Sequence, residues 1–124
     1  MVEAWGVDLS SCCEAAVDAL LQLCIDMTSP RLAGTARLAV EPGATESLLY
    51  SLLDEVIFVM DTSPNPPIAA RVSHTPGGGL DVELQLAEPD SVAQIGSAPK
   101  AISRSEFDVV ESADGVTCRF LVDV

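Results

Sequence analysis

The stretch Leu80-Asp81-Val82-Glu83-Leu84-Gln85-Leu86 decides the fold class, because apolar and polar residues alternate along it without a break. Alternation with a period of two residues is typical of a β-strand that buries one face and exposes the other. Such strands belong mainly to antiparallel sheets, since parallel sheets are usually covered on both faces. We therefore expect other elements of the chain to cover the face that carries the leucines.

Two amphipathic helices are predicted upstream of this strand. In the first, residues 11–27, apolar residues recur at helical spacing, Ser11-x-x-Glu14 fits a capping box, and Ser29-Pro30 ends the helix. The second helix, residues 45–60, has a broader apolar stripe, which favours a helix lying on a sheet. The residues of this stripe are Leu48, Leu49, Leu52, Leu53, Val56 and Met60.

Further strands are expected at residues 2–5, 37–41, 68–74, 100–111 and 116–124. With the two helices they give the order β-α-β-α-β-β-β-β along one α+β domain, residues 1–124. We expect a mostly antiparallel sheet that contains residues 80–87, 100–111 and 115–124. Both helices would pack on one face of that sheet.

Asp114-Gly115 is a strong hairpin signal between the last two predicted strands. If these two residues form the turn, Val109 faces Phe120 and Glu106 faces Asp123. Neighbouring carboxylates repel each other unless a cation or a proton lies between them. The pair is therefore either part of a cation site or simply two solvated carboxylates, and the sequence leaves both interpretations open.

The composition excludes several classes of protein. Hydrophobic residues make up 48% of the 124 residues, which excludes a disordered chain. No apolar run approaches the roughly 18–20 residues of a membrane span. The first residues contain Glu3 and no basic region, unlike a secretory signal. We therefore expect a cytoplasmic protein.

The charge balance indicates which kinds of partner the protein can bind. The net charge is −13, with six Lys and Arg residues against 19 Asp and Glu residues. Such a surface repels phosphate backbones, so we expect no direct binding to nucleic acid. The acidic surface either docks on a basic partner or serves solubility alone, and both alternatives remain open.

No catalytic or zinc-binding motif is present. The four cysteines, Cys12, Cys13, Cys24 and Cys118, include no C-x-x-C pair and are interpreted as core residues. His74 has no paired nucleophile in a recognisable motif. Gly77-Gly78-Gly79 precedes a strand rather than a helix and therefore is not a phosphate loop. We expect a protein that is not an enzyme.

Three stretches together resemble one family. Ala4-Trp5-Gly6 is an aromatic-glycine motif before the first helix, and residues 46–55 form a helix with Leu-Leu-Tyr and a final Asp-Glu pair. Lys100-Ala101-Ile102 opens a strand, and the chain ends on Leu121-Val122-Asp123-Val124. In order and spacing these stretches are similar to the archease family along nearly the whole chain.

The resemblance implies a function and a set of site residues. Archeases are non-catalytic activators of the RtcB-type tRNA-splicing RNA ligase, which they help through its guanylylation step and keep turning over. By resemblance, Asp123 and Val124 would bind a divalent metal ion, with Ca²⁺ expected. Lys100 would belong to the site that serves the ligase. At Asp123 and Val124 two hard oxygen ligands lie within one residue of each other, which suits Ca²⁺ or Mg²⁺.

This sequence also departs from the family pattern. The family has a His-Thr-Ala-Asp motif before the aromatic-glycine pair, and its Asp is a further metal ligand; the chain as given starts too late to contain it. The family's Lys-Ala-hydrophobic-Thr-Tyr-His becomes Lys100-Ala101-Ile102-Ser103-Arg104-Ser105, and an acidic position before the second helix is Ala44. The alternative is a diverged archease-fold binding or structural module without metal or ligase activation.

Overall fold

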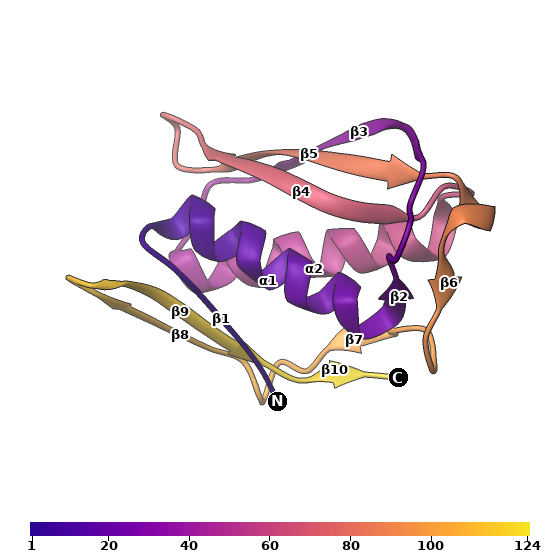
Figure 1. The fold of residues 1–124 in the computed structure, drawn as a ribbon. Coiled ribbons are helices and arrows are strands. Elements are labelled where there is room, and N and C mark those ends of the chain that lie inside the picture. Colours follow the sequence, from indigo (N-terminus) through magenta and orange to yellow (C-terminus); the bar gives the residue numbers. More distant parts are fainter.

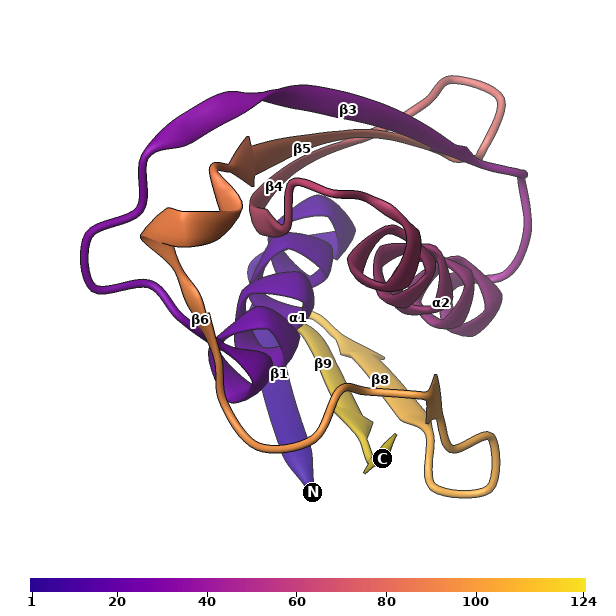
Figure 2. The same ribbon diagram turned by 90° about the vertical axis from the view of Figure 1, so that its right-hand side faces the viewer.

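The computed structural model describes residues 1–124, and in it two helices lie between two antiparallel sheets (Figure 1, Figure 2). The helices are α1 (Leu9–Cys24) and α2 (Thr45–Thr62). One sheet has the order β1-β9-β8 and contains Val2–Gly6, Gly115–Phe120 and Asp108–Ser112. The other has the order β3-β5-β4 and contains Leu32–Val40, Leu80–Ala87 and Pro67–His74.

Two short strand pairs complete the fold. In one, β2 (Ile25–Asp26) pairs with β6 (Ala93–Gln94), and in the other β7 (Ala101–Ile102) pairs with β10 (Val122–Asp123). A 3₁₀ turn at Pro89–Ser91 leads from β5 to β6. None of the helices combines the length and the apolar character that crossing a membrane requires.

The predicted α+β class, with two helices packed on antiparallel sheets, is confirmed. The predicted single sheet is wrong, because β5 belongs to one sheet and β9 to the other. The reason lies in α1. Successive residues of a helix are about 100° apart around its axis, and on this basis the buried residues of α1 cover about half of the helix circumference. Besides the predicted stripe, Cys12 and Ala16 are fully buried. The helix therefore buries apolar surface against both sheets, and a core cluster of 25 buried residues joins all these elements.

The start of α1 differs from the predicted capping box. The helix begins at Leu9, and the Asp8 carboxylate caps it by accepting a hydrogen bond from the Ser11 backbone N–H at 2.8 Å. This hydrogen bond lowers the pKa of Asp8 from its ordinary value of 3.8. The Glu14 carboxylate instead accepts a hydrogen bond from the backbone N–H of Val72 in β4, at 2.9 Å. Glu14 thus ties α1 to the β3-β5-β4 sheet.

Several predicted boundaries are also corrected. Helix α1 ends at Cys24, before Ser29-Pro30, because Ile25 adopts an extended backbone and begins β2. The predicted strand 100–111 is divided into β7 and β8, and 116–124 is divided into β9 and β10. Between β7 and β8 the chain turns, and the Ser103 and Ser105 hydroxyls lie 3.2 Å apart.

The register of the last hairpin differs from the prediction. Ser112 pairs with Gly115, so Ala113-Asp114 form the turn and Val109 pairs with Cys118 rather than with Phe120. The reason is conformational. Gly115 has a positive φ of +148°, whereas a type I′ turn on Asp114-Gly115 would require a positive φ at Asp114 as well. The apolar faces still match, because the shift preserves the alternation along each strand.

Two glycines allow close backbone contacts around β1. A Cβ atom on Gly6 would lie 2.2 Å from the backbone nitrogen of Cys12, so Gly6 lets β1 approach the first turn of α1. A Cβ atom on Gly115 would lie 2.4 Å from the carbonyl oxygen of Gly6. These contacts bring β1, β9 and α1 together at one corner of the fold.

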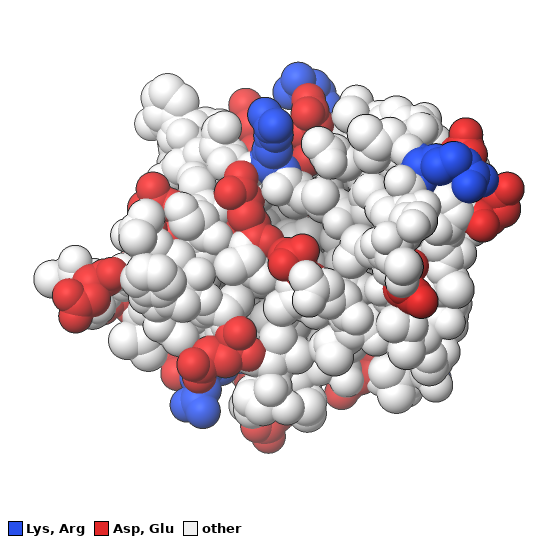
Figure 3. All heavy atoms as spheres, in the orientation of Figure 1, with Lys and Arg blue, Asp and Glu red and all other residues white.

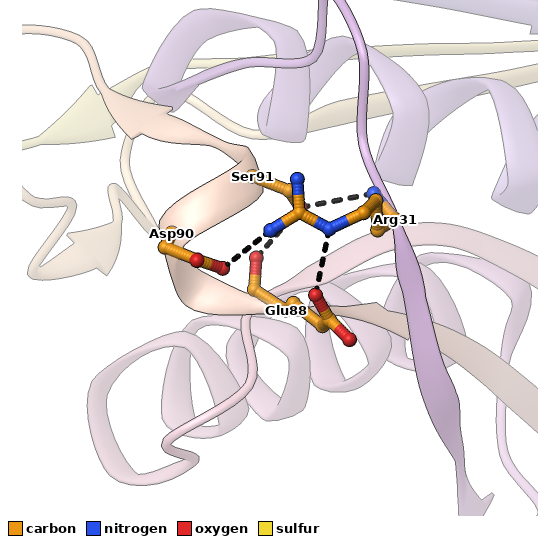
Figure 4. A network of polar contacts seen from close by, with 4 residues as sticks. All are labelled: Arg31, Glu88, Asp90 and Ser91. Atoms are coloured by element: carbon orange, nitrogen blue, oxygen red, sulfur yellow. Dashed lines mark hydrogen bonds and ion pairs between the residues drawn. The ribbon is translucent and has the colours of Figure 1, made fainter.

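An exposed polar network holds the segment after β5 (Figure 4). The Arg31 guanidinium forms ion pairs with Glu88 at 2.7 Å and with Asp90 at 2.8 Å, and these acids raise the pKa of Arg31. The Arg31 backbone N–H donates to the Ser91 hydroxyl at 2.9 Å. The network fixes the 3₁₀ turn from which the chain runs through β6 toward Lys100.

Candidate partner-binding site

Pairing of β7 with β10 brings the predicted site residues together. Ala101 pairs with Asp123 and Ile102 with Val122. The backbone N–H of Lys100 donates a hydrogen bond to the carbonyl oxygen of Asp123 at 2.8 Å. Lys100, Asp123 and Val124 thus occupy neighbouring positions on the surface, and all of them are exposed.

Tyr50 on α2 supports β7 and the turn that follows it. Its hydroxyl donates a hydrogen bond to the carbonyl oxygen of Ile102 at 3.1 Å. Its ring contacts Phe107 edge to face with centroids 5.4 Å apart, and the Arg104 guanidinium carbon lies 4.2 Å from the Tyr50 ring centroid. The Ile102 side chain is also buried, so β7 is anchored to the body of the fold both by the hydrogen bond from Tyr50 and by a core side chain. The Leu-Leu-Tyr motif therefore contributes both core residues and this support.

A hollow of about 500 Å³ opens next to Lys100, between α2 and the segment that precedes β7. Its lining residues are Asp54, Ile57, Phe58, Asp61, Ala98, Pro99 and Lys100. Phe58 is 62% exposed, an unusual position for a large aromatic side chain. Sequence reasoning missed Phe58, although its place outside the predicted α2 stripe was a signal that it faces away from the core.

Two basic side chains of this region, Lys100 and Arg104, are unpaired in a protein of net charge −13. Three of the other basic side chains, Arg31, Arg37 and Arg119, are each paired with an acid. On the face shown in Figure 3 acidic side chains are spread widely, and the few basic ones lie beside acidic ones. Lys100 is thus an exposed cation without a carboxylate partner of its own.

The chain's own donors do not by themselves complete a Ca²⁺ site. Asp123 offers a carboxylate and Val124 a terminal carboxylate, but nowhere does the structure gather three or more acidic, His or Cys side chains that could hold a metal ion. The predicted contribution of Glu106 is wrong, because Asp123 pairs with Ala101 and Glu106 lies in the turn after β7. Ca²⁺ takes about 6–8 oxygen ligands. Most of them would have to come from water or from another molecule.

The structure contains no arrangement suited to nucleophilic catalysis. His74 lies exposed at the end of β4 and forms no side-chain hydrogen bond. All four thiols are free and buried. Burial raises the pKa of Cys12 to about 11 and that of Cys13 and Cys118 to about 12. A thiol that stays protonated at neutral pH is a poor nucleophile.

Comparison with known sequences settles the family. The sequence profile of the Archease protein family matches residues 1–124. The chain belongs to the archease family. "Probable protein archease" of Mycobacterium tuberculosis, strains CDC 1551 and H37Rv, is 28% identical over 123 residues, which are 99% of this chain and 68% of the relative.

Two solved structures have the archease fold found here. The archease of Thermotoga maritima, described as a possible chaperone, matches with a TM-score of 0.73 and 17% identity over 99% of this chain and 88% of that one. Protein 1598 of Methanobacterium thermoautotrophicum matches with a TM-score of 0.76 and 21% identity over 98% of this chain and 89% of that one. The resemblance seen in the sequence motifs is therefore confirmed for family and fold.

Proposed function

We propose that this archease is a non-catalytic protein cofactor that promotes guanylylation and turnover of an RtcB-type tRNA-splicing RNA ligase in the cytoplasm. The observation that carries the proposal is the pairing of β7 with β10, which brings Lys100 beside Asp123 and Val124. These are the residues to which the family resemblance assigns a role.

The geometry suggests how this surface would engage the ligase. The Lys100 ammonium is exposed and has no ion-pair partner, so a carboxylate or phosphate at the ligase site would be its natural counterion. Phe58, in the hollow beside Lys100, offers an apolar anchor for a side chain of the ligase. Aromatic side chains are enriched in protein–protein interfaces.

The test measures ligase guanylylation with labelled GTP, using the RNA ligase of the same organism with and without this protein. Addition of the wild-type protein is expected to increase the amount of guanylylated ligase, and Lys100→Ala is expected to weaken the effect. Arg37→Ala is the matched control. Arg37 is also exposed, but it lies on β3 in the β3-β5-β4 sheet and forms an ion pair with Glu83. No increase with wild-type protein would refute the proposal, and equal effects of the two variants would remove Lys100 from the site.

Binding of a divalent cation by Asp123 and Val124 is a further part of the proposal. With only two carboxylates from the chain we expect weak Ca²⁺ binding, at about 10⁻⁴–10⁻³ M. Calorimetric titration should show lower affinity for Asp123→Asn and for a version extended by one C-terminal glycine, which displaces the terminal carboxylate. Asp81→Asn, an exposed acid on β5, should bind like wild type. If all three variants bind alike, the ion lies elsewhere.

A second candidate function is a diverged archease-fold binding or structural module without metal or ligase activation. It is favoured by the lack of a third acidic, His or Cys ligand near Asp123. It predicts no calorimetric heat with Ca²⁺ and no change in ligase guanylylation for the wild-type protein. The two experiments together therefore separate the two candidates.

A further inference from the structure

The outer face of the β1-β9-β8 sheet carries an unpartnered aromatic residue. Thr117 in β9 pairs with Trp5 on one side and with Val110 on the other, so these residues form one row across the sheet. The neighbouring row is Glu3, Arg119 and Asp108. We call these six residues the Trp5 face: Glu3, Trp5, Asp108, Val110, Thr117 and Arg119.

This face points away from the core. The alternate residues of the same strands, including Ala4 and Cys118, are buried in the core cluster that contains α1. On the Trp5 face, by contrast, Trp5 is 53% exposed and Val110 54% exposed. Large apolar side chains that share one exposed face often mark an interaction site.

The Trp5 ring packs against a glycine. A Cβ atom on Gly115 would lie 2.8 Å from Nε1 and 3.0 Å from Cε2 of Trp5, so the indole rests directly on the Gly115 backbone. One part of the ring is thereby packed while about half of the residue stays open to a partner. An aromatic side chain that is already ordered loses little conformational entropy on binding, which favours it as an interface anchor.

The charges around the anchor select the kind of partner. In the neighbouring row Arg119 lies between Glu3 and Asp108, with Glu3 at 3.1 Å, so this row has one more negative than positive charge. Asp114 adds another carboxylate in the turn beside Gly115. A second copy of this chain would bring like charges together, and RNA would be repelled. A protein with an apolar pocket surrounded by Lys and Arg complements the face.

We propose that the Trp5 face is a docking surface for a basic protein partner, which inserts the exposed part of Trp5 into an apolar pocket. Identification of that partner with the RNA ligase rests on the proposed function. In that case the face is a second contact, separate from Lys100, and it contributes affinity rather than activation.

The face itself is tested without any ligase. Trp5 is the one tryptophan of the chain, so its fluorescence reports contact at this position. The probes are two synthetic peptides of equal positive charge, one alternating Lys with Leu and the other alternating Lys with Ser. The Lys-Leu peptide is expected to shift Trp5 emission to shorter wavelength, and the Lys-Ser peptide is not. Val110→Lys should weaken the binding that produces this shift at least tenfold, because it removes an apolar side chain and adds a charge that repels the peptide.

Leu32→Lys is the matched control, since Leu32 is an exposed apolar residue on β3 in the β3-β5-β4 sheet. Equal shifts with both peptides, or equal affinities of Val110→Lys and Leu32→Lys, would overturn the proposal. A shift that grows with protein concentration alone, together with dimers in sedimentation, would assign the face to self-association and also overturn it.

The ligase is tested separately by titrating this protein into the guanylylation assay. Val110→Lys is expected to raise the concentration for half-maximal guanylylation at least tenfold while leaving the plateau unchanged, whereas Lys100→Ala lowers the plateau. If wild type does not activate the ligase, the proposed function fails and the peptide experiment still decides the face. If wild type activates it and Val110→Lys acts at the same concentration, the ligase is not the partner of this face.

Discussion

The backbone N–H of Lys100 donates a hydrogen bond to the carbonyl oxygen of Asp123, with 2.8 Å between nitrogen and oxygen. The bond holds Lys100, the residue that precedes β7, beside Asp123 while leaving both side chains free. The Lys100 ammonium and the Asp123 carboxylate form no ion pair, so each is available to an outside group. A partner that binds one of them therefore meets the other close by.

Replacement of Leu53 by alanine should destabilise the protein by about 2–5 kcal/mol. Leu53 is fully buried on α2, so its removal leaves a cavity in the core. Phe58→Ala, on the exposed side of the same helix, should cost less than about 1 kcal/mol. Urea unfolding measures both, and similar losses would mean that the α2 faces are wrongly assigned.

Gly115→Ala should destabilise the fold far more than Gly34→Ala. Both glycines have a positive φ, +148° and +126°, so both substitutions introduce backbone strain of about 1–3 kcal/mol. Only at Gly115 does the new Cβ also meet backbone, the Gly6 carbonyl oxygen at 2.4 Å, whereas nothing lies within 4 Å at Gly34. The difference between the thermal midpoints of the two variants measures the steric effect at Gly115. Equal midpoint shifts for the two variants would show that there is no such effect.

Stability should fall as the pH rises above the ordinary thiol pKa of 9.0. Burial raises the pKa of Cys13 and Cys118 to about 12, so the folded state keeps protons that the unfolded state loses. The stabilisation is complete below pH 9 and is lost progressively toward pH 12, by about 1.4 kcal/mol per pH unit for each such thiol. Urea unfolding at several alkaline pH values measures this slope. Cys118→Ala should make the slope shallower, and an unchanged slope would contradict the assignment.

Tyr50→Phe should lower the unfolding free energy by about 0.5–1.5 kcal/mol, because the hydrogen bond to the Ile102 carbonyl is lost while the ring remains. Tyr50→Leu should cost more, since it also removes the ring contacts with Phe107 and Arg104. Urea unfolding of both variants gives the comparison. Equal losses would mean that the ring contacts add nothing to the support of β7.

The isolated protein should not bind tRNA at physiological salt. The net charge of −13 repels the phosphate backbone, and the three unpaired cations, Arg71, Lys100 and Arg104, are too few to form a basic surface. A filter-binding assay with a basic RNA-binding protein as positive control checks this. Salt-sensitive binding in the micromolar range would show that the chain contacts RNA directly.

The elements with a clear period were predicted well. The alternation from Leu80 to Leu86 is β5, and five members of the α2 stripe are buried, with Met60 half-buried. Alternation shows that one face of a strand is covered, but it does not show which sheet the strand joins. For that reason β5 and β9 were assigned to one sheet, although α1 and α2 separate them.

The candidate site could be predicted only in part from the sequence. Family resemblance pointed to Lys100, Asp123 and Val124, and the pairing of β7 with β10 shows that these residues, far apart in the chain, lie close together. The interpretation of Glu106 failed because it assumed an unbroken strand from 100 to 111, and the turn after Ile102 carries Glu106 away from β10. The exposure of Phe58 could have been predicted from its place outside the α2 stripe, whereas nothing in the pattern around Trp5 indicated that Trp5 is exposed.

The pairing of β7 with β10 is only two residues long on each strand. Outside that pair, the adjoining backbone contacts are the bonds from Lys100 to Asp123 and from Ser103 to Leu121. Such a small unit can open locally while both three-stranded sheets stay intact. Amide hydrogen exchange will therefore be faster at Lys100 and Ser103 than along the centre of β9. The end of the chain can rearrange around a partner at a cost well below that of unfolding the protein.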